Sequence, residues 1–484
     1  MKAVESVNLR ERILGVDQLV PLLDGRLVPY VNLDNAASTP PLRDVLAAIE
    51  RFLPFYASIH RGTGFKSRLS TVAYEQAHAI IGRFVGADLG SNTVIFGKNT
   101  TEAINKLSYR LPLPPEAVVI TTQLEHHSND LPWRQRARVV HVRATPEGRL
   151  DEEDFDRQLA RYAGRLALVT VAGASNVTGF IQPIHRLARK AHAVGTRILV
   201  DAAQLAPHRR LDMKPDADPE HLDFVAISAH KMYAPFGTGA LIGPQEVFLQ
   251  NGPEYSGGGT VNVVTPDEVY WAGEPDRDEA GSPNVVGAVA LAVAAQVLMD
   301  VGMDNVAALE HELLTYTLQR LRDVPGIKIY GEADPARAQE KVGVIPFNLP
   351  GVSHFLVAAI LGYEGGIGVR SGCFCAHPYV VHLLGLTGEE SRTWRTRLLG
   401  GDKSHMPGMV RLSFGCYNNT ADVDRLVAML ERIGRGAYRG DYRMEASSGE
   451  YLPANYQEPL AEYFLLEEMA HPVGRSLPCG WSSA

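Results

Sequence analysis

The chain has 484 residues, which is enough for two or three domains with substantial cores. Apolar residues make up 45% of the chain and charged residues 21%, and the net charge of −8 gives no support for nucleic-acid or membrane-surface partners. There is no apolar run long enough to span a bilayer, no apolar signal core in residues 1–5 and only four cysteines, so we expect a cytoplasmic protein with free thiols.

Short apolar runs without alternation occur between about residues 90 and 245, at 93–96, 117–120, 166–171 and 198–200. Such runs are typical of strands that are buried on both faces of a mostly parallel sheet. Helical patterns such as 184–194 separate them. The sequence therefore predicts an α/β domain with helices on both faces, and ligands at the carboxyl ends of its strands.

The pattern changes after residue 284. Residues 285–301 and 303–321 predict two helices that leave the large domain. Beyond them we expect a smaller α+β domain, with strands at 327–330, 342–348 and 409–414 and helices at 353–361 and 421–433.

These patterns predict four parts of the chain. Residues 1–30 form an N-terminal segment that packs with the small domain, and residues 31–300 form the large domain. Residues 301–437 form the small domain. Residues 438–484 form a C-terminal extension that could wrap the surface or cover a partner subunit.

The most informative stretch is Ser228 to Tyr233. Lys231 follows the apolar run 222–227 and precedes Gly237 and Gly239. A lysine at the end of a buried strand can form a Schiff base with pyridoxal phosphate once partial burial lowers its pKa. Asp201 ends an earlier strand, where a carboxylate can keep a pyridinium nitrogen protonated and make the ring an electron sink. The two positions together predict a site for this cofactor.

Residues 97–102 follow one strand and open a helix. Free amides at that helix start, with the hydroxyls of Thr100 and Thr101, would make a phosphate cradle. Ser228 and His230 are natural further donors beside Lys231. The alternative is a plain capping box without a ligand.

His126 follows the strand 118–122 and could stack on a pyridine ring. The neighbouring His127 makes a metal site the alternative, but adjacent residues at a strand end point in opposite directions and no third ligand is evident, so we predict no metal. Asn176 follows another strand and could hydrogen-bond a phenolic oxygen, or simply form an Asn/Gly turn.

Taken together, these residues resemble the class V, fold-type I pyridoxal-phosphate enzymes, and most closely the group II cysteine desulfurases and selenocysteine lyases. The similarity runs from about Val31 to Gly434. Its segments are 33–38, 60–62, 100–105, 125–127, 175–179, 201–204, 228–231, 280–284, 370–376 and 411–413. The resemblance implies a large domain with a mostly parallel seven-stranded sheet and a smaller α+β C-terminal domain.

The resemblance also implies roles at the cofactor. Lys231 holds pyridoxal phosphate covalently, His126 stacks on the ring and Asp201 pairs with the pyridinium nitrogen. Asn176 and Gln204 contact the ring hydroxyl. The other implied cofactor contacts are Thr100, Thr101, Ser228, His230 and Ser282.

Ser282 is implied to reach the phosphate from a second subunit, which makes the protein a homodimer with shared active sites. On the substrate side, Arg411 is implied to clamp the α-carboxylate, a task that suits a bidentate guanidinium. The implied substrate contacts beside it are Arg370, Ala36 and His60.

Cys375, five residues after Arg370, occupies the position of the cysteine that takes sulfur in the desulfurases. The reaction needs a thiolate, which Arg370, His377 or the cofactor phosphate could stabilise. The alternative is a buried structural cysteine.

The chain departs from the group II pattern at Cys373 and Phe374, where those enzymes typically carry paired histidines. The string Gly-Cys-Phe-Cys is more similar to the desulfurase part of molybdenum-cofactor sulfurases, so Cys373 is a second candidate for the sulfur carrier. The two cysteines could also be half of a metal site, although no other half is evident. Residues 381–408 form an insertion for which we favour a lid or loop beside the site over an acceptor-docking element or a solvated loop.

The predicted function is a cysteine desulfurase that converts L-cysteine into L-alanine, forms a persulfide on Cys375 and passes the sulfur to an acceptor protein or small molecule. One rival keeps the cofactor but is an aminotransferase, epimerase or C–S/C–N lyase, with Cys375 a bystander. The other is a non-catalytic scaffold, against which intact Lys231, Asp201 and Arg411 argue. Cysteine, selenocysteine and larger thio-amino acids all stay open as the natural substrate.

Overall fold

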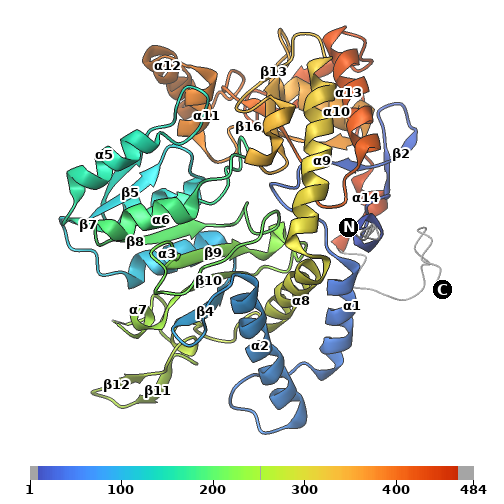
Figure 1. Ribbon diagram of the computed structural model, residues 1–484. Helices are drawn as coiled ribbons and strands as arrows, with labels where there is room; N and C mark the ends of the chain where they lie inside the picture. The colour runs from blue at the N-terminus through green and yellow to red at the C-terminus, as the bar shows by residue number, and fades with distance from the viewer. Residues whose placement is uncertain (1–8, 251, 467–484) are drawn as a thin grey trace, which may run out of the picture.

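The computed structural model describes residues 9–250 and 252–466. A seven-stranded sheet forms the centre of the large domain, in the order β4-β10-β9-β8-β7-β5-β6 (Figure 1). Its strands are β4 (Asn92–Gly97), β5 (Val118–Thr122), β6 (Arg138–Val142), β7 (Leu166–Ala172), β8 (Arg197–Asp201), β9 (Phe224–Ser228) and β10 (Gly239–Pro244). Only β10 runs antiparallel to its neighbours, β4 and β9. The predicted mostly parallel seven-stranded sheet is confirmed.

The strands are apolar because both faces of the sheet are covered. Every residue of β5 and of β9 is buried. One face packs on α2 (Phe65–Phe84), α5 (Glu152–Tyr162), α6 (Ile184–Ala193) and α8 (Val285–Val301). The other face packs on α3 (Thr100–Arg110), α4 (Leu131–Arg134) and α7 (Gln245–Leu249). Because both faces of the sheet lie in a core, the strands have consecutive apolar residues rather than an alternation of apolar and polar residues.

The small domain has a separate core around a four-stranded antiparallel sheet in the order β13-β14-β17-β16. The strands are β13 (Lys328–Ile329), β14 (Val344–Asn348), β16 (Arg370–Gly372) and β17 (Met409–Ser413), and the covering helices are α10 (His354–Gly365) and α13 (Thr420–Gly434). The long helix α9 (Met303–Arg322) follows α8 and leads from the large domain to the small one (Figure 1). The helices and strands predicted for this part of the chain are present, with ends shifted by a few residues.

The start of the described chain contacts both domains. Leu9, in η1 (Leu9–Arg12), belongs to the core of the large domain. The hairpin of β1 (Leu19–Pro21) and β2 (Leu27–Pro29) lies on the small domain, where Arg425 of α13 donates to the Pro29 carbonyl at 2.6 Å. Two residues further on, β3 (Val31–Asn32) pairs with β15 (Ile367–Gly368), and α1 (Arg43–Phe52) packs against α8.

The C-terminal extension runs over the small domain of its own chain. It contains β18 (Tyr442–Met444), β19 (Tyr451–Pro453) and α14 (Leu460–Tyr463). The buried carboxylate of Glu364 accepts from the amides of Arg439 at 2.8 Å and Gly440 at 2.9 Å, which ties the extension to α10. Residues 1–8 and 467–484, which include Cys479 and the outer ends of the two predicted terminal segments, lie outside the described residues.

Two further features project from the domains. The hairpin of β11 (Val261–Val264) and β12 (Val269–Trp271) extends from the large domain, and α11 (His377–Leu384) and α12 (Gly388–Leu399) lie near α5 (Figure 1). In the described ranges, no single helix is long and apolar enough to cross a membrane; α8 and α9 reach that threshold only as a pair, bent by 76°.

Candidate active site

A cavity of about 420 Å³ opens at the carboxyl ends of the central strands. It lies where β8 ends in Asp201 and β9 ends in Ser228, with the start of α3 at one side and β16 and β17 of the small domain at the other. The predicted site residues that line it are Ala36, Thr100, Thr101, His126, Asn176, Asp201, Gln204, Ser228, His230, Lys231, Arg370, Cys375 and Arg411. His60 and Ser282 do not line it.

Lys231 enters the cavity because the chain turns immediately after β9. A short 3-10 helix, η4 (Ala229–Lys231), follows Ser228, and the amide of Met232 closes it by donating to the Ala229 carbonyl at 2.8 Å. Burial lowers the pKa of Lys231 to about 8, although nearby Asp201 acts in the opposite direction. A larger fraction of this amine is therefore neutral, and nucleophilic, near physiological pH than in an ordinary lysine.

Asp201 is a buried carboxylate for which the described residues supply no ion-pair partner, although Lys231 lies close enough to lower its pKa. Its Oδ1 accepts from the amide of Ala203 at 3.0 Å, and among the described residues no arginine, lysine or histidine forms an ion pair with it. Burial raises its pKa. A buried carboxylate is costly unless a positive group meets it, so this position suits a ligand that brings a protonated nitrogen.

The start of α3 carries both a cap and a cluster of hydroxyls. Asn99 is the N-cap and accepts from the amide of Glu102 at 3.0 Å, as the capping alternative predicts. Beside it, the Ser228 hydroxyl accepts from the amide of Thr100 at 2.8 Å and lies 2.9 Å from its hydroxyl. The Thr101 and Ser128 hydroxyls are 2.6 Å apart. The helix start therefore offers amide and hydroxyl donors to an anion.

Gly239 allows β10 to approach this helix start. A side-chain carbon at position 239 would lie 2.6 Å from the Cα of Asn99 and 2.6 Å from the Ile227 carbonyl oxygen. Both are backbone atoms and have little room to move. Close packing of β10 against the start of α3 thus requires glycine at position 239.

His126 presents a neutral ring to the cavity. Its Nδ1 accepts from the amide of Ser128 at 3.1 Å. Burial lowers its pKa to about 3, and the charges of Lys231 and Arg411 act in the same direction. Burial likewise lowers the pKa of His230 to about 4. Ser128 is a cavity residue to which the sequence analysis gave no role, although it lies two residues after His126.

Arg370 and Arg411 meet at one carboxylate. Arg411 is 3% exposed; its Nη2 lies 2.9 Å from Asp34 Oδ1, and Arg370 Nη2 lies 2.9 Å from Asp34 Oδ2. Arg411 also donates to the Asn176 carbonyl at 3.0 Å, while its Nε is buried without a partner among the described residues. Asp34 lies in the recognised segment 33–38 but was not predicted as a site residue. Two guanidinium groups that line the cavity thus share one carboxylate of the protein itself.

Cys375 lies on a tight loop that the large domain holds in place. Phe374 and Cys375 both have left-handed backbone conformations, with φ of 53° and 54°. The Phe374 carbonyl accepts from the Asn176 side-chain amide at 2.8 Å, and the Cys375 carbonyl accepts from the amide of His127 at 2.8 Å. Non-glycine residues adopt this conformation only where neighbours enforce it. The Cys375 side chain is exposed at the cavity.

Cys373 has a different environment. It is buried, and its thiol donates to the Pro407 carbonyl at 3.0 Å. Burial raises its pKa to about 12, which keeps the thiol protonated. Of the two candidate sulfur carriers, the geometry therefore favours Cys375.

The insertion 381–408 is largely helical and contacts the Cys375 loop through aromatic rings. It contains the end of α11 and all of α12, which begins with a capping box of Thr387 and Glu390. The His377 ring stacks on His127, with ring centroids 4.8 Å apart and an interplanar angle of 13°. On the ring of Trp394 in α12 it stacks with a centroid distance of 6.4 Å and an interplanar angle of 14°. The insertion thus lies beside the site; its role stays a prediction.

His60 and Ser282 lie elsewhere in the single chain. His60 has a left-handed conformation, is 3.7 Å from Asp276 and lines a second cavity of about 340 Å³ with Tyr74. Ser282 is exposed just before α8. The resemblance places Ser282 at the site of a second subunit, and that expectation stays a prediction.

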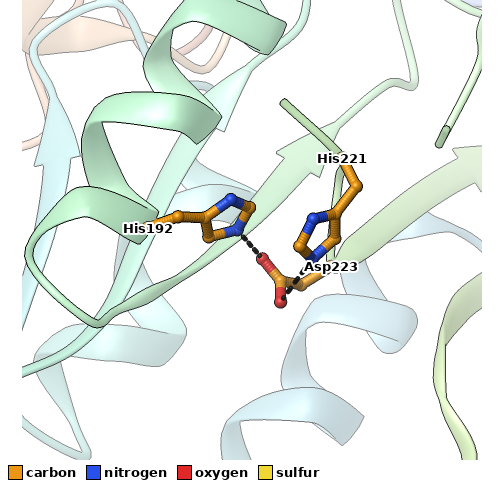
Figure 2. A group of neighbouring side chains, drawn as sticks. All are labelled: His192, His221 and Asp223. Carbon is orange, nitrogen blue, oxygen red and sulfur yellow. Dashed lines mark hydrogen bonds and ion pairs between the residues drawn. The ribbon is translucent and has the colours of Figure 1, made fainter. Parts of the chain in front are cut away.

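Among the described residues, one group of potential metal ligands lies just before the start of β9: His192, His221 and Asp223 (Figure 2). His192 Nε2 lies 2.8 Å from Asp223 Oδ2, and His221 Nε2 lies 3.6 Å from Oδ1. Asp223 also accepts from the Ile198 amide at 2.9 Å and has Arg197 3.9 Å away. The hydrogen bond to Asp223 raises the pKa of His192. Because protein groups already surround the carboxylate and one is a cation, we interpret the cluster as an ion pair.

The fold and cavity define an α/β protein with a buried lysine at the carboxyl edge of its sheet, and residues 31–426 match the model of the aminotransferase class-V family. The chain belongs to this family, as the resemblance predicted. A cysteine desulfurase of Haloferax volcanii is 34% identical over 431 residues, which cover 87% of this chain and 93% of the relative. A cysteine desulfurase of Dickeya dadantii is 34% identical over 418 residues, covering 84% and 92%.

Solved structures agree with this assignment. A cysteine desulfurase from Thermococcus onnurineus superposes with a TM-score of 0.73 at 30% identity, covering 88% of this chain and 99% of its own. A cysteine desulfurase from Escherichia coli superposes with a TM-score of 0.71 at 27% identity, covering 89% and 98%. The predicted fold-type I architecture is confirmed.

Proposed function

We propose that the protein is a pyridoxal-phosphate-dependent cysteine desulfurase, which converts L-cysteine into L-alanine and transfers the sulfur to its own Cys375. The observation that carries this proposal is that Lys231, Asp201, Arg411 and an exposed Cys375 all line one cavity. Relatives of the same family that match most of the chain are named cysteine desulfurases, which supports it.

The cavity residues fit pyridoxal phosphate. In the described part of the chain, Asp201 forms no ion pair and the buried Oε1 of Gln204 has no partner; a pyridinium nitrogen and a ring hydroxyl would meet these two groups. Lys231 would hold the aldehyde carbon and His126 the ring face. The residues that would hold the phosphate are Thr100, Thr101, Ser228 and His230. Bound pyridoxal phosphate supplies an electron sink that stabilises negative charge at the substrate Cα.

The arginines bind and orient the amino acid. Arg411 and Arg370 share the Asp34 carboxylate in this structure, and a substrate carboxylate can take part in the same pairing or meet the free Nε of Arg411. This fixes the Cα near Lys231. With a pKa of about 8, Lys231 can take the proton from Cα and later return one.

Cys375 then receives the sulfur. Its thiolate forms an S–S bond to the substrate sulfur while the bond between that sulfur and Cβ breaks, and the electrons of the broken bond stay with the carbon fragment, which is protonated to alanine. The net change is L-cysteine plus the Cys375 thiol giving L-alanine plus a Cys375 persulfide, with no external oxidant. The resting cysteine must be ionised for this attack.

We further infer the setting of the reaction. Ser282 and His60 are exposed in the single chain. In a homodimer they would contact ligands in the active site of the second subunit. The sulfur would pass from exposed Cys375 to an acceptor protein or small molecule, past α11 and α12. The net charge and sequence favour a cytoplasmic location without nucleic-acid or membrane partners.

A product assay tests the proposal. Purified protein loaded with pyridoxal phosphate is incubated with L-cysteine and a thiol reductant, and alanine, sulfide and keto acid are measured. We expect alanine and sulfide in equal amounts. Keto acid without alanine would establish an aminotransferase, and sulfide with pyruvate would establish a C–S lyase; either result overturns the proposal.

A further inference from the structure

His127 of the large domain contacts the Cys375 loop at two points. Its backbone amide donates to the Cys375 carbonyl at 2.8 Å. Its ring nitrogen Nε2 accepts from the backbone amide of His377 at 3.3 Å and lies 3.0 Å from His377 Nδ1. The two contacts flank Ala376, so one residue fixes the backbone immediately after the residue that bears the thiol.

These hydrogen bonds define which ring nitrogens carry protons. Because His127 Nε2 accepts from an amide, it has a free lone pair, and His377 Nδ1 must then be the donor in the contact between the two rings. Burial lowers the pKa of both histidines. Both rings are therefore neutral near pH 7, and His127 keeps its acceptor for the His377 amide.

The backbone of this loop depends on its neighbours. Phe374 and Cys375 have φ of 53° and 54°, and residues other than glycine hold this conformation only where the surroundings enforce it. The Asn176 side chain fixes the Phe374 carbonyl at 2.8 Å, and the His127 amide fixes the Cys375 carbonyl. Loss of the contacts on the His127 side would let the loop relax and move the thiol.

The segment that holds the loop also carries a cavity residue. His126 lines the cavity, whereas the ring of the next residue, His127, stacks on His377 outside it. A short 3-10 helix, η3 (His127–Asn129), begins here, and the His126 side chain caps it by accepting from the amide of Ser128. One fixed turn therefore sets the place of the His126 ring and of the Cys375 loop relative to each other.

The elements after the loop support the same arrangement. The His377 ring also stacks on the ring of Trp394 in the insertion, with a centroid distance of 6.4 Å. The helix α11, which begins at His377, is attached to the large domain further on, where His382 Nε2 donates to the Thr145 carbonyl at 2.7 Å. The insertion and α11 thus keep His377 in reach of His127.

We propose that His127, through its contacts with Cys375 and His377, is a positioning residue that holds the sulfur-accepting thiol at its working distance from the substrate sulfur. The inference rests on the proposed function, in which Cys375 attacks that sulfur. Lys231 and Arg411 line the cavity and His127 does not, so a looser loop slows sulfur transfer without weakening cofactor or substrate binding. A misplacement of about 1 Å can cost about a hundred-fold in rate.

Two substitutions at position 127 separate the acceptor nitrogen from the bulk of the ring. His127→Leu keeps the backbone amide and an apolar side chain but removes the acceptor, whereas His127→Gln keeps an acceptor oxygen. In the full-length protein loaded with pyridoxal phosphate, His127→Leu should slow alanine and Cys375 persulfide formation in a single turnover by roughly ten- to a hundred-fold. KM for L-cysteine and the cofactor absorption should stay unchanged, and His127→Gln should recover most of the lost rate.

Amide hydrogen exchange gives a readout that does not depend on turnover. The His377 amide is hydrogen-bonded to the His127 ring, so a peptide covering 373–377 should exchange faster in His127→Leu and as slowly as the wild type in His127→Gln. If His127→Leu does not fold, His377→Ala takes its place. It removes the contact between the rings but keeps the backbone amide, and it should slow persulfide formation by a smaller factor.

His221→Leu is the matched control, because His221 is also a half-buried histidine but lies near the start of β9. It should change neither the rate nor the exchange of 373–377. The proposal is overturned if His127→Leu forms the persulfide at the wild-type rate, or if His127→Gln loses as much rate as His127→Leu. It is also overturned if KM and cofactor binding change as much as the rate.

The outcome is separable from that of the proposed function. Wild-type protein that binds pyridoxal phosphate but forms no alanine from L-cysteine refutes the proposed function, and the positioning role with it. Wild-type protein that forms alanine and a Cys375 persulfide, with His127→Leu equally active, refutes only the positioning role.

Discussion

The carboxylate of Asp34 lies 2.9 Å from the guanidinium of Arg411, which lines the cavity from β17 of the small domain. Both groups come from segments that meet only in the folded protein, since Asp34 precedes the large domain's first helix and Arg411 lies on β17. The contact marks the place where we propose that the substrate carboxylate binds.

Arg411→Lys should therefore weaken substrate binding. A lysine cannot offer two parallel N–H donors, and a lost hydrogen bond between charged groups costs about 1.5–3 kcal/mol. We expect KM for L-cysteine to rise by roughly ten- to a hundred-fold, with a smaller change in kcat. Arg370→Lys, at a side chain that is 51% exposed, is the matched control and should change KM less. Equal effects of the two substitutions would contradict the assignment.

Lys231 should be the lysine that becomes covalently attached to the cofactor. The chain offers a matched control in Lys341, which is also buried and whose pKa burial lowers to about 7, but which donates to the Glu332 carbonyl away from the cavity. After borohydride reduction of the loaded protein, peptide mass spectrometry should find the cofactor on Lys231 alone. Lys231→Ala should lose at least about a hundred-fold in activity. If the cofactor is found on Lys341 instead, the assignment of Lys231 as the cofactor-binding lysine is wrong.

The rate of cofactor attachment should rise with pH around 8. Burial lowers the pKa of Lys231 to about 8, so the neutral, reactive amine becomes the majority above that value and is lost as pH falls below it. Mixing apoprotein with pyridoxal phosphate at a series of pH values and following absorbance gives the rate. If the rate keeps rising towards pH 10, as for an ordinary lysine, burial does not lower the pKa of Lys231 and the prediction is wrong.

Gly239→Ala should destabilise the fold and weaken cofactor binding together. The added carbon would lie 2.6 Å from backbone atoms of β9 and of the start of α3, and overpacking of this kind costs about 1–3 kcal/mol. Urea unfolding gives the loss of free energy, and a titration gives the loss in cofactor affinity. Gly273→Ala is the control, because nothing lies within 4 Å of an added carbon there. If Gly239→Ala binds pyridoxal phosphate with unchanged affinity, the packing of Gly239 does not support cofactor binding and the prediction is wrong.

The residues that end buried strands could be predicted from the sequence. Asp201 and Ser228 end apolar runs, and Thr100 lies three residues after the end of β4; in a mostly parallel sheet such ends share one edge. Their meeting in one cavity follows from that topology. The direction of β10 follows from chain length, because the short connection 229–238 cannot carry a parallel crossover, which takes a dozen or more residues.

Other features depend on long-range packing that a local pattern does not contain. The pairing of Asp34 with two arginines joins segments more than 300 residues apart. The left-handed conformations of Phe374 and Cys375 are held by His127 and Asn176 from the large domain. The helices of the insertion were not predicted either, since α12 buries no residue fully and shows only a narrow partly buried stripe.

The most direct test of the central claim is the mass of the Cys375 peptide after a single turnover with L-cysteine and no reductant. We predict a gain of one sulfur on Cys375, alanine in equal amount, an unmodified Cys373 peptide, and loss of both products in Cys375→Ala but not in Cys373→Ala. Alanine formed by Cys375→Ala at the wild-type rate, or sulfur carried by Cys373, would contradict the account.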